Sequence, residues 1–194
     1  TPSGAVDCWG LNYYGQAADM PGPFTQISTG VDHTCGLTPD GAIDCWGNDE
    51  FGQLGSGHNV GPYTQVSAGS AYTCGLTPDG AIDCWGNDDF GQATDMPGSY
   101  TQVSAGSGHT CGLMMDGAID CWGDNYLGKA TDMPGPFTQV SASGGLTCGL
   151  LTTGAVDCWG SLVGGPAAHP GSYEQFSTSY DHICGLTPTG AVEC

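Results

Sequence analysis

The sequence predicts an all-β protein, specifically a β-propeller built of short three-stranded blades. Three observations support this: a repeat of about 37 residues, three strand-like segments in each period, and cysteine pairs ten residues apart. Periods of 20–50 residues are typical of solenoids, propellers and arrays. With 35 Gly and 12 Pro among 194 residues, the chain has little room for long helices.

The repeat is marked by five copies of Cys-Trp-Gly, whose tryptophans follow one another at intervals of 37, 39, 37 and 37 residues. We expect these tryptophans to form the repeat core, because large aromatic surfaces dominate such packing; sugar stacking, as in propeller lectins, is the alternative. They are Trp9, Trp46, Trp85, Trp122 and Trp159. The prediction is a single repeat domain over 1–194, with repeats at approximately 11–47, 48–86, 87–123, 124–160 and 161–194.

Each period contains three candidate strands. The first alternates apolar and polar residues, as a half-buried strand does, and it occurs at 24–28, 63–67, 100–104, 137–141 and 173–177. In the first full repeat, the second and third strands, Thr34–Leu37 and Ala42–Trp46, flank Thr38-Pro-Asp-Gly41, which is typical of a tight hairpin turn. Because one such sheet cannot bury both of its faces, neighbouring units must pack together.

The cysteines give an independent indication of the hairpins. Centring each hairpin on its turn places two cysteines opposite each other on adjacent strands, with Cβ atoms about 4.5–5.5 Å apart, close to disulfide geometry. A zinc site is the alternative, but Cys-x2-Cys clusters and regularly spaced histidines are missing from the sequence. We therefore predict five disulfides and an extracellular, secreted or cell-surface location. The predicted pairs are Cys35 with Cys45, Cys74 with Cys84, Cys111 with Cys121, Cys148 with Cys158, and Cys184 with Cys194.

One cysteine, Cys8, has no partner ten residues before it. It lies in the surplus strand of residues 1–10, which repeats a third strand without its first two, and Gly190–Cys194 is a sixth copy of the same strand. Three explanations compete for this remnant of a preceding or partner blade. The chain is a segment of a longer protein, which is favoured; or the strand docks on another subunit, with Cys8 as an assembly thiol; or the terminus hangs free with an unpaired thiol.

Residues 33–53, with the order His-x-Cys, Asp-Gly, Cys-Trp-Gly and Gly-Gln, resemble the regulator-of-chromosome-condensation and β-lactamase-inhibitor protein II-like repeat family, of the secreted Cys-Trp-Gly type. The resemblance covers essentially the whole chain and implies a β-propeller. The family usually closes at seven blades, so five full units are a departure from it. Family functions range from chromatin binding to enzyme inhibition, and the loop residues that inhibitors use have no position-by-position match here.

Charge excludes some partners. The chain has 20 acidic residues and a single base, Lys129, for a net charge of −19. Affinity for phosphate backbones rests on basic contacts, so nucleic acid is excluded as a direct partner. The sequence also has no apolar run long enough for a membrane-spanning helix, so membrane insertion is not expected.

Two repeated positions are candidates for chemistry. An acidic residue precedes the third-strand cysteine in every unit and would form an acidic circle in a ring, where calcium is a candidate ligand and a solvated strand position is the alternative. These residues are Asp7, Asp44, Asp83, Asp120, Asp157 and Glu193. Another position holds His33, Tyr72, His109, Leu146 and His182, a variation that favours packing over catalysis.

We therefore expect an extracellular structural or protein-interaction repeat protein, a subunit of a surface assembly or filament, with no catalytic residues and no cofactor other than candidate calcium. The expected partner is protein, including copies of the chain itself arranged head-to-tail. The alternative is a binding module, either lectin-like with a glycan ligand or an enzyme-inhibitor propeller, which would use the variable loops after each Trp-Gly.

Overall fold

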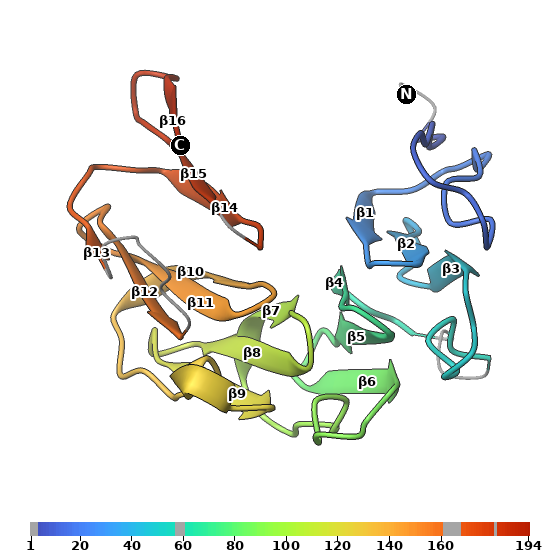
Figure 1. Ribbon diagram of the computed structural model, residues 1–194, viewed down its shortest axis with the longest axis horizontal. Coiled ribbons are helices and arrows are strands. Elements are labelled where there is room, and N and C mark those ends of the chain that lie inside the picture. The colour runs from blue at the N-terminus through green and yellow to red at the C-terminus, as the bar shows by residue number, and fades with distance from the viewer. Residues whose placement is uncertain (1–3, 57–60, 161–167, 181) are drawn as a thin grey trace. The chain divides into compact units, whose positions relative to one another are not determined.

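A computed structural model describes residues 4–56, 61–160, 168–180 and 182–194. Within these residues the only helical element is a single 3-10 turn, η1 (Tyr126–Gly128). All other regular structure is β-strand, grouped in separate antiparallel sheets (Figure 1). The all-β prediction is confirmed.

Each of the five sheets contains the three predicted strands in sequence order. The first strands are β1 (Gln26–Thr29), β4 (Gln65–Ala68), β7 (Tyr100–Ala105), β10 (Phe137–Ala142) and β14 (Gln175–Thr178). The middle strands are β2 (His33–Leu37), β5 (Tyr72–Leu76), β8 (His109–Met114), β11 (Leu146–Leu151) and β15 (Ile183–Leu186). The third strands are β3 (Ile43–Gly47), β6 (Ile82–Gly86), β9 (Ile119–Gly123), β12 (Val156–Gly160) and β16 (Val192–Glu193).

Several blades also have a fourth strand position, at the sheet edge beyond the third strand, which was not predicted. The short strand β13 (Ala168–His169) pairs with β12, and single methionines bridge the equivalent strand position elsewhere, in the pairs Val6–Met20, Ile82–Met96 and Ile119–Met133. The preceding aspartate fixes this edge, since its carboxylate accepts the N–H of the third-strand cysteine: Asp95 from Cys84 at 2.9 Å, for example. A single bridged residue has no alternating pattern, but the recurring Asp-Met-Pro-Gly at 19–22, 95–98 and 132–135 marks its place in the sequence.

The predicted hairpin turn forms as expected. In the first full repeat, the Gly41 N–H donates to the Thr38 carbonyl at 3.0 Å, and the Thr38 N–H donates to the Ala42 carbonyl at 2.9 Å. Gly41 has φ of +87°, a conformation that favours glycine. This turn sets the register in which Cys35 faces Cys45.

The five predicted disulfides are all present, one in each hairpin, with Cα atoms 4.0–4.1 Å apart. Each predicted pair, ten residues apart, is formed: Cys35 bonds Cys45, Cys74 bonds Cys84, Cys111 bonds Cys121, Cys148 bonds Cys158, and Cys184 bonds Cys194. Cys8 forms no disulfide within the described part of the chain.

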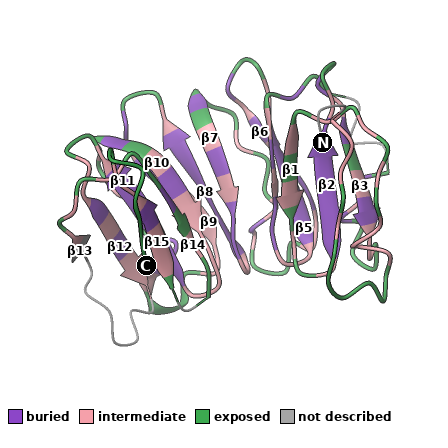
Figure 2. Ribbon diagram, turned by 90° about the horizontal axis from the view of Figure 1, so that it is seen from above, coloured by how far each residue is buried: buried purple, intermediate pink, exposed green. Residues whose placement is uncertain are grey.

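The middle strands carry most of the buried residues. Strands β2 and β5, and most of β8 and β11, are buried along their length (Figure 2). Four of the five disulfides lie in this buried layer, since Cys35, Cys74, Cys111 and Cys148 are each 0% exposed. In the fifth, Cys184 is partly buried and Cys194 is exposed. On the third strands, Cys84 and Cys158 are also buried, whereas Cys121 is partly buried and packs against the core of its own blade.

The chain groups into two compact units, one comprising Thr1–Asp89 and Ala93–Ser99, the other Phe90–Gln92 and Tyr100–Cys194. Each is described by itself below. No helix within the described ranges is long and apolar enough to cross a membrane.

Candidate interaction surfaces

In the first unit, neighbouring blades are joined by two polar side chains of a first strand. The Gln26 amide donates to the Val66 carbonyl at 3.2 Å and accepts the Val66 N–H at 3.0 Å. Two residues on, the Ser28 hydroxyl accepts the Ala68 N–H at 2.8 Å. These side chains, which we call the Gln–Ser clamp, satisfy backbone groups of the next blade that its own sheet leaves unpaired.

The second unit repeats the clamp twice. Gln102 accepts the Val140 N–H at 2.8 Å, and Ser104 accepts the Ala142 N–H at 2.8 Å. Gln139 then binds Phe176 through both its N–H, at 3.2 Å, and its carbonyl, at 2.8 Å. A sequence signal for this exists, because Gln-x-Ser stands in the first strand of every repeat. The alternation pattern, however, assigns those positions simply to a solvated face.

Within the described residues, no clamp binds the receiving edge of the first blade. Ile27 is 37% exposed, whereas the residues at its position in the other blades are 1–3% exposed. Those residues are Val66, Val103, Val140 and Phe176. The exposure of Ile27 therefore measures what a preceding blade covers.

The last blade, conversely, has a clamp that binds nothing in the described part of the chain. Gln175 and Ser177 are both exposed, and neither side chain makes a hydrogen bond to another described residue. One blade thus offers a clamp while another offers the backbone edge that such a clamp binds.

Most of the tryptophans pack as predicted. Each contacts the aromatic ring 22 residues earlier, with ring centroids 5.9–6.2 Å apart, a separation typical of favourable aromatic pairs. The pairs are Phe24–Trp46, Tyr63–Trp85, Tyr100–Trp122 and Phe137–Trp159.

Trp9 is the exception, and the prediction that it belongs to the core is wrong: its side chain is 89% exposed. The physical reason is that each covered tryptophan packs on an aromatic ring, whereas no ring of the described residues packs on Trp9. Together with Val6, Cys8 and Ile27, Trp9 lines an open groove of about 360 Å3.

The histidine position is confirmed as a packing position where it is buried. His33 is 1% exposed, and its Nε2 lies 2.9 Å from the Thr73 hydroxyl of the next blade, which donates to the Gln53 carbonyl. His109 and Thr147 repeat the contact at 2.8 Å. Burial lowers the pKa of both imidazoles to about 4, so they are neutral at pH 7. His182, in the last blade, is exposed.

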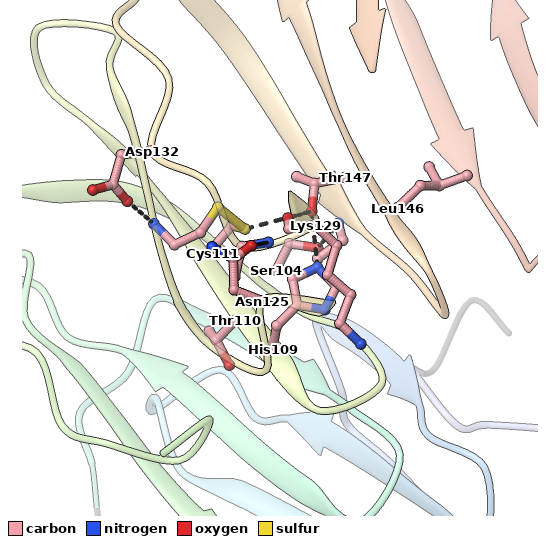
Figure 3. The surroundings of a disulfide bond; sticks show 12 residues. Ser104, His109, Thr110, Cys111, Asn125, Lys129, Asp132, Leu146 and Thr147 are labelled. Atoms are coloured by element: carbon pink, nitrogen blue, oxygen red, sulfur yellow. Dashed lines mark hydrogen bonds between the residues drawn. A yellow bond between two sulfur atoms is a disulfide. The ribbon is translucent and has the colours of Figure 1, made fainter. Parts of the chain in front are cut away.

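The single base of the chain lies beside this contact (Figure 3). The Lys129 ammonium is 2.9 Å from the Asp124 carboxylate and donates to the Ser107 carbonyl at 3.1 Å. Its side chain is only 8% exposed. Lys129 occupies the place of Gln16, Gln53 and Gln92 in other repeats, so this charge is a local substitution within the repeat pattern.

The acidic position before each third-strand cysteine is used differently from blade to blade. In three blades the residue 20 positions before the acidic residue is a tyrosine, and its hydroxyl donates to the carboxylate. The pairs are Tyr63–Asp83, Tyr100–Asp120 and Tyr173–Glu193. Phe24 and Phe137 stand opposite Asp44 and Asp157 and have no hydroxyl to offer. Among the described residues, no three His, Cys, Asp or Glu side chains are grouped so that they could hold a metal ion.

The last hairpin is the least covered. β15 and β16 share two register pairs, whereas the middle and third strands of every other blade share five. Val192 is 67% exposed, against 0–2% for the residues at its position in the other four hairpins. An open cavity of about 260 Å3 lies here against Tyr173, Ile183 and Cys194.

The loops after Trp-Gly present exposed apolar side chains. Their exposed fractions run from 49% for Phe51 to 85% for Tyr13. Tyr14, Phe90, Tyr126 and Leu127 lie in the same loops of other repeats. The fifth loop, predicted at 161–164, falls outside the described residues.

The comparisons identify the repeat. Residues 24–53, 63–92 and 100–129 match the model of the Regulator of chromosome condensation (RCC1) repeat. Among curated protein sequences, none matches the chain.

Solved structures extend the similarity to the whole chain. The entire ectodomain of the Physcomitrella patens receptor kinase CR4 is 28% identical, with a TM-score of 0.80 over 100% of this chain and 56% of that one. The CRINKLY WD40 ectodomain of the Arabidopsis thaliana receptor kinase ACR4 is 25% identical, with a TM-score of 0.73 over 93% and 67%. This chain thus spans about half to two thirds of the length of these ectodomains.

A third structure, Saccharomyces cerevisiae Prp20p, described with its binding properties to Gsp1p and histones, is 16% identical, with a TM-score of 0.70 over 87% of this chain and 57% of Prp20p. At that identity it shows the fold alone, an RCC1-type propeller. The disulfides and the two ectodomains together point to an extracellular location.

Proposed function

Because three segments of this chain match the RCC1 repeat, we propose that it is a secreted protein-interaction module that assembles head-to-tail with copies of itself. The observation that carries the proposal is the open clamp. Gln175 and Ser177 are exposed on the last blade, and Ile27 is exposed on the first. The proposed role is binding, and the clamp and the exposed Ile27 are features of a binding surface, so the proposal includes no catalytic step.

The clamps inside the chain indicate how two copies would meet. Gln139 binds Phe176 through two hydrogen bonds, and the bound residue is 3% exposed. Gln175 of one copy would bind Ile27 of another in the same way. The contact would bury the Ile27 side chain and satisfy backbone groups that otherwise remain in water.

Sedimentation equilibrium over a range of protein concentrations tests the proposal. The work is best done in moderate salt, because two copies each of net charge −19 repel one another when unscreened. We expect the mean mass to rise with concentration. The double variant Gln175→Ala with Ser177→Ala should shift the mean mass toward the monomer.

Glu174→Gln is the matched control, because it changes the exposed residue just before the clamp and leaves the clamp intact. It should associate at least as well as the unchanged chain. A chain that is monomeric at every concentration, or a double variant that associates as well as the control, contradicts the proposal.

A second candidate function is a binding module that takes glycans or another protein on its loops. It is favoured by the exposed aromatic residues that recur after Trp-Gly, such as Tyr14, Phe51 and Phe90, since aromatic rings stack readily on sugars and other flat ligands. A glycan array tests it: binding that disappears with Phe51→Ala and Phe90→Ala supports this function, and an array without signal removes the lectin form of it.

A further inference from the structure

We infer that the second blade carries a docking pocket for one basic side chain, lysine or arginine, of a partner protein. The pocket lies between the hairpin turn of that blade and the segment that leads into its first strand, β4. The inference goes beyond the head-to-tail contact and does not depend on it, because all the lining residues lie within 61–83.

The pocket combines apolar and acidic lining in one open cavity of about 380 Å3. Pro62, Tyr63 and Pro78 supply the apolar lining, and Asp79 and Asp83 supply two carboxylates. Lysine and arginine match this combination, because each has a cationic head on an apolar stem. A pair of fully exposed charges contributes little to binding, but here the apolar lining would also remove the stem from water.

The Tyr63 side chain is fixed by contacts within its own blade. Its ring lies against Gly75, where an added Cβ would come within 2.6 Å of it, and its centroid is 6.1 Å from that of Trp85. Its hydroxyl donates to the Asp83 carboxylate at 3.3 Å. An apolar wall and a carboxylate are therefore in place before a ligand arrives, so binding requires little further ordering of the protein.

The electrostatics of the pocket favour a cation. The Thr77 hydroxyl donates to Asp79 and holds the pKa of that carboxyl below its usual range, so Asp79 is anionic at neutral pH. Burial, followed by the charges of Asp83 and Asp95, raises the pKa of the Tyr63 hydroxyl to about 12. Negative charge thus acts on the lining from both carboxylates and from Asp95 beside them.

The occupant is a side chain of a different protein. Lys129 is the single base in residues 1–194, and its ammonium lies 2.9 Å from Asp124 with the side chain only 8% exposed. A second copy of these residues therefore has no accessible basic side chain to offer. The pocket opens beside a hairpin turn whose Pro78 and Asp79 are exposed, so a side chain that projects from another protein can enter it.

A titration followed by 15N–1H correlation spectra tests the pocket on the whole chain with its disulfides intact. The probes are Nα-acetyl-lysine amide and Nα-acetyl-arginine amide, and we expect one or both to cause saturable shifts of the Tyr63, Asp79 and Asp83 amides. Nα-acetyl-norleucine amide keeps an apolar stem without the charge, and methylamine keeps the charge without the stem. Each should bind at least about tenfold more weakly, because each lacks one of the two interactions.

Two variants and a matched control connect the binding to the carboxylates. Asp83→Asn keeps an oxygen that accepts the Tyr63 hydroxyl and should weaken binding at least about tenfold. Asp79→Asn should weaken it about two- to fivefold, since this carboxylate is exposed. Asp40→Asn is the control, because Asp40 has the same turn position in the first blade and the same contact with a threonine hydroxyl. It removes an equal charge and should leave the affinity unchanged.

The alternatives give different results. Methylamine that binds as well as the lysine probe, or an equal loss of affinity in Asp40→Asn, would show attraction to the overall negative charge and overturn the pocket. The absence of saturable shifts with either probe also overturns it. A peptide with one lysine, Gly-Ser-Lys-Ser-Gly with blocked ends, should bind at least as tightly as the lysine probe; its exclusion would overturn the assignment to a protein partner. Sedimentation tests the head-to-tail contact separately, so the two proposals can fail independently.

Discussion

Replacing Asp124 by Asn should destabilise the protein more than replacing Lys129 by Gln, although the two side chains form one ion pair. The asymmetry comes from burial, because the lysine side chain is 8% exposed and the aspartate 30%. Asp124→Asn leaves an ammonium group buried with the Ser107 carbonyl as its remaining partner. Lys129→Gln leaves a carboxylate that water already reaches.

The magnitude follows from the same geometry. Breaking a fully buried ion pair by removing one partner costs about 3–5 kcal/mol. Water access to this site reduces that figure, so we expect Asp124→Asn to lower the free energy of unfolding by about 2–3 kcal/mol and Lys129→Gln by about 1 kcal/mol or less. For a chain of this size, the first corresponds to a fall in Tm of about 4–12 °C.

The double variant supplies the control. Asp124→Asn with Lys129→Gln restores the combination found at Asn48 with Gln53 and at Asn87 with Gln92. It should therefore be as stable as Lys129→Gln alone to within about 0.5 kcal/mol. Denaturant unfolding with the disulfides intact measures all three. Equal losses for the two single variants, or a double variant whose loss is the sum of theirs, would refute the reasoning.

Three further predictions concern protonation and charge. Burial lowers the pKa of His33 and His109 from 6.5 to about 4, so lowering the pH from about 7 to 5 should reduce the free energy of unfolding by about 2 kcal/mol per histidine. Replacing each histidine by Tyr, the residue at position 72, should flatten the dependence of that free energy on pH. An unchanged pH dependence counts against the argument. Burial, together with the neighbouring Asp83 and Asp120, raises the pKa of Tyr63 and Tyr100 to about 12, so an absorbance titration should show both ionising above the ordinary range of tyrosine, and Asp83→Asn should lower the pKa of Tyr63. Sodium chloride should raise Tm by screening the net charge of −19; calcium chloride at matched ionic strength should do no more, and a larger rise with calcium would support a site at the acidic positions.

The part of the fold that the sequence predicts is the part set by local spacing. Cysteines ten residues apart around a Pro-Asp-Gly turn fix the hairpin, its register and its disulfide, and each of these depends only on neighbouring residues. The methionine edge depends instead on a single bridge between segments about 14 residues apart, such as Ile82 and Met96. A single bridge has no alternation of apolar and polar residues, so the recurring Asp-Met-Pro-Gly at these positions does not by itself predict a strand.

The residues of the Gln–Ser clamp could be recognised in the sequence, but their role could not. A Gln followed two residues later by Ser recurs in every first strand, yet a polar residue on an alternating strand is ordinarily assigned to solvent. Only the spatial neighbour reveals that Gln26 binds the backbone of Val66, 40 residues away. Trp9 failed as a core prediction by the same logic, because its repeat motif is intact while the ring that its counterparts contact is missing.

The clamp also determines the symmetry of any assembly it builds. A clamp side chain binds a backbone edge, so two copies of Gln175 placed face to face would satisfy nothing, and each contact joins the last blade of one copy to the first blade of another. The contact must be heterologous, which propagates unless it closes on itself. A chain without a working clamp, Gln175→Ala with Ser177→Ala, can then still receive a neighbour at Ile27 but cannot bind the next one. Added in small amounts to the unchanged protein, it should end growing assemblies and lower their mean mass in proportion to its fraction, as light scattering would measure. A mean mass that ignores the variant until it is in large excess would show that copies do not add through this end.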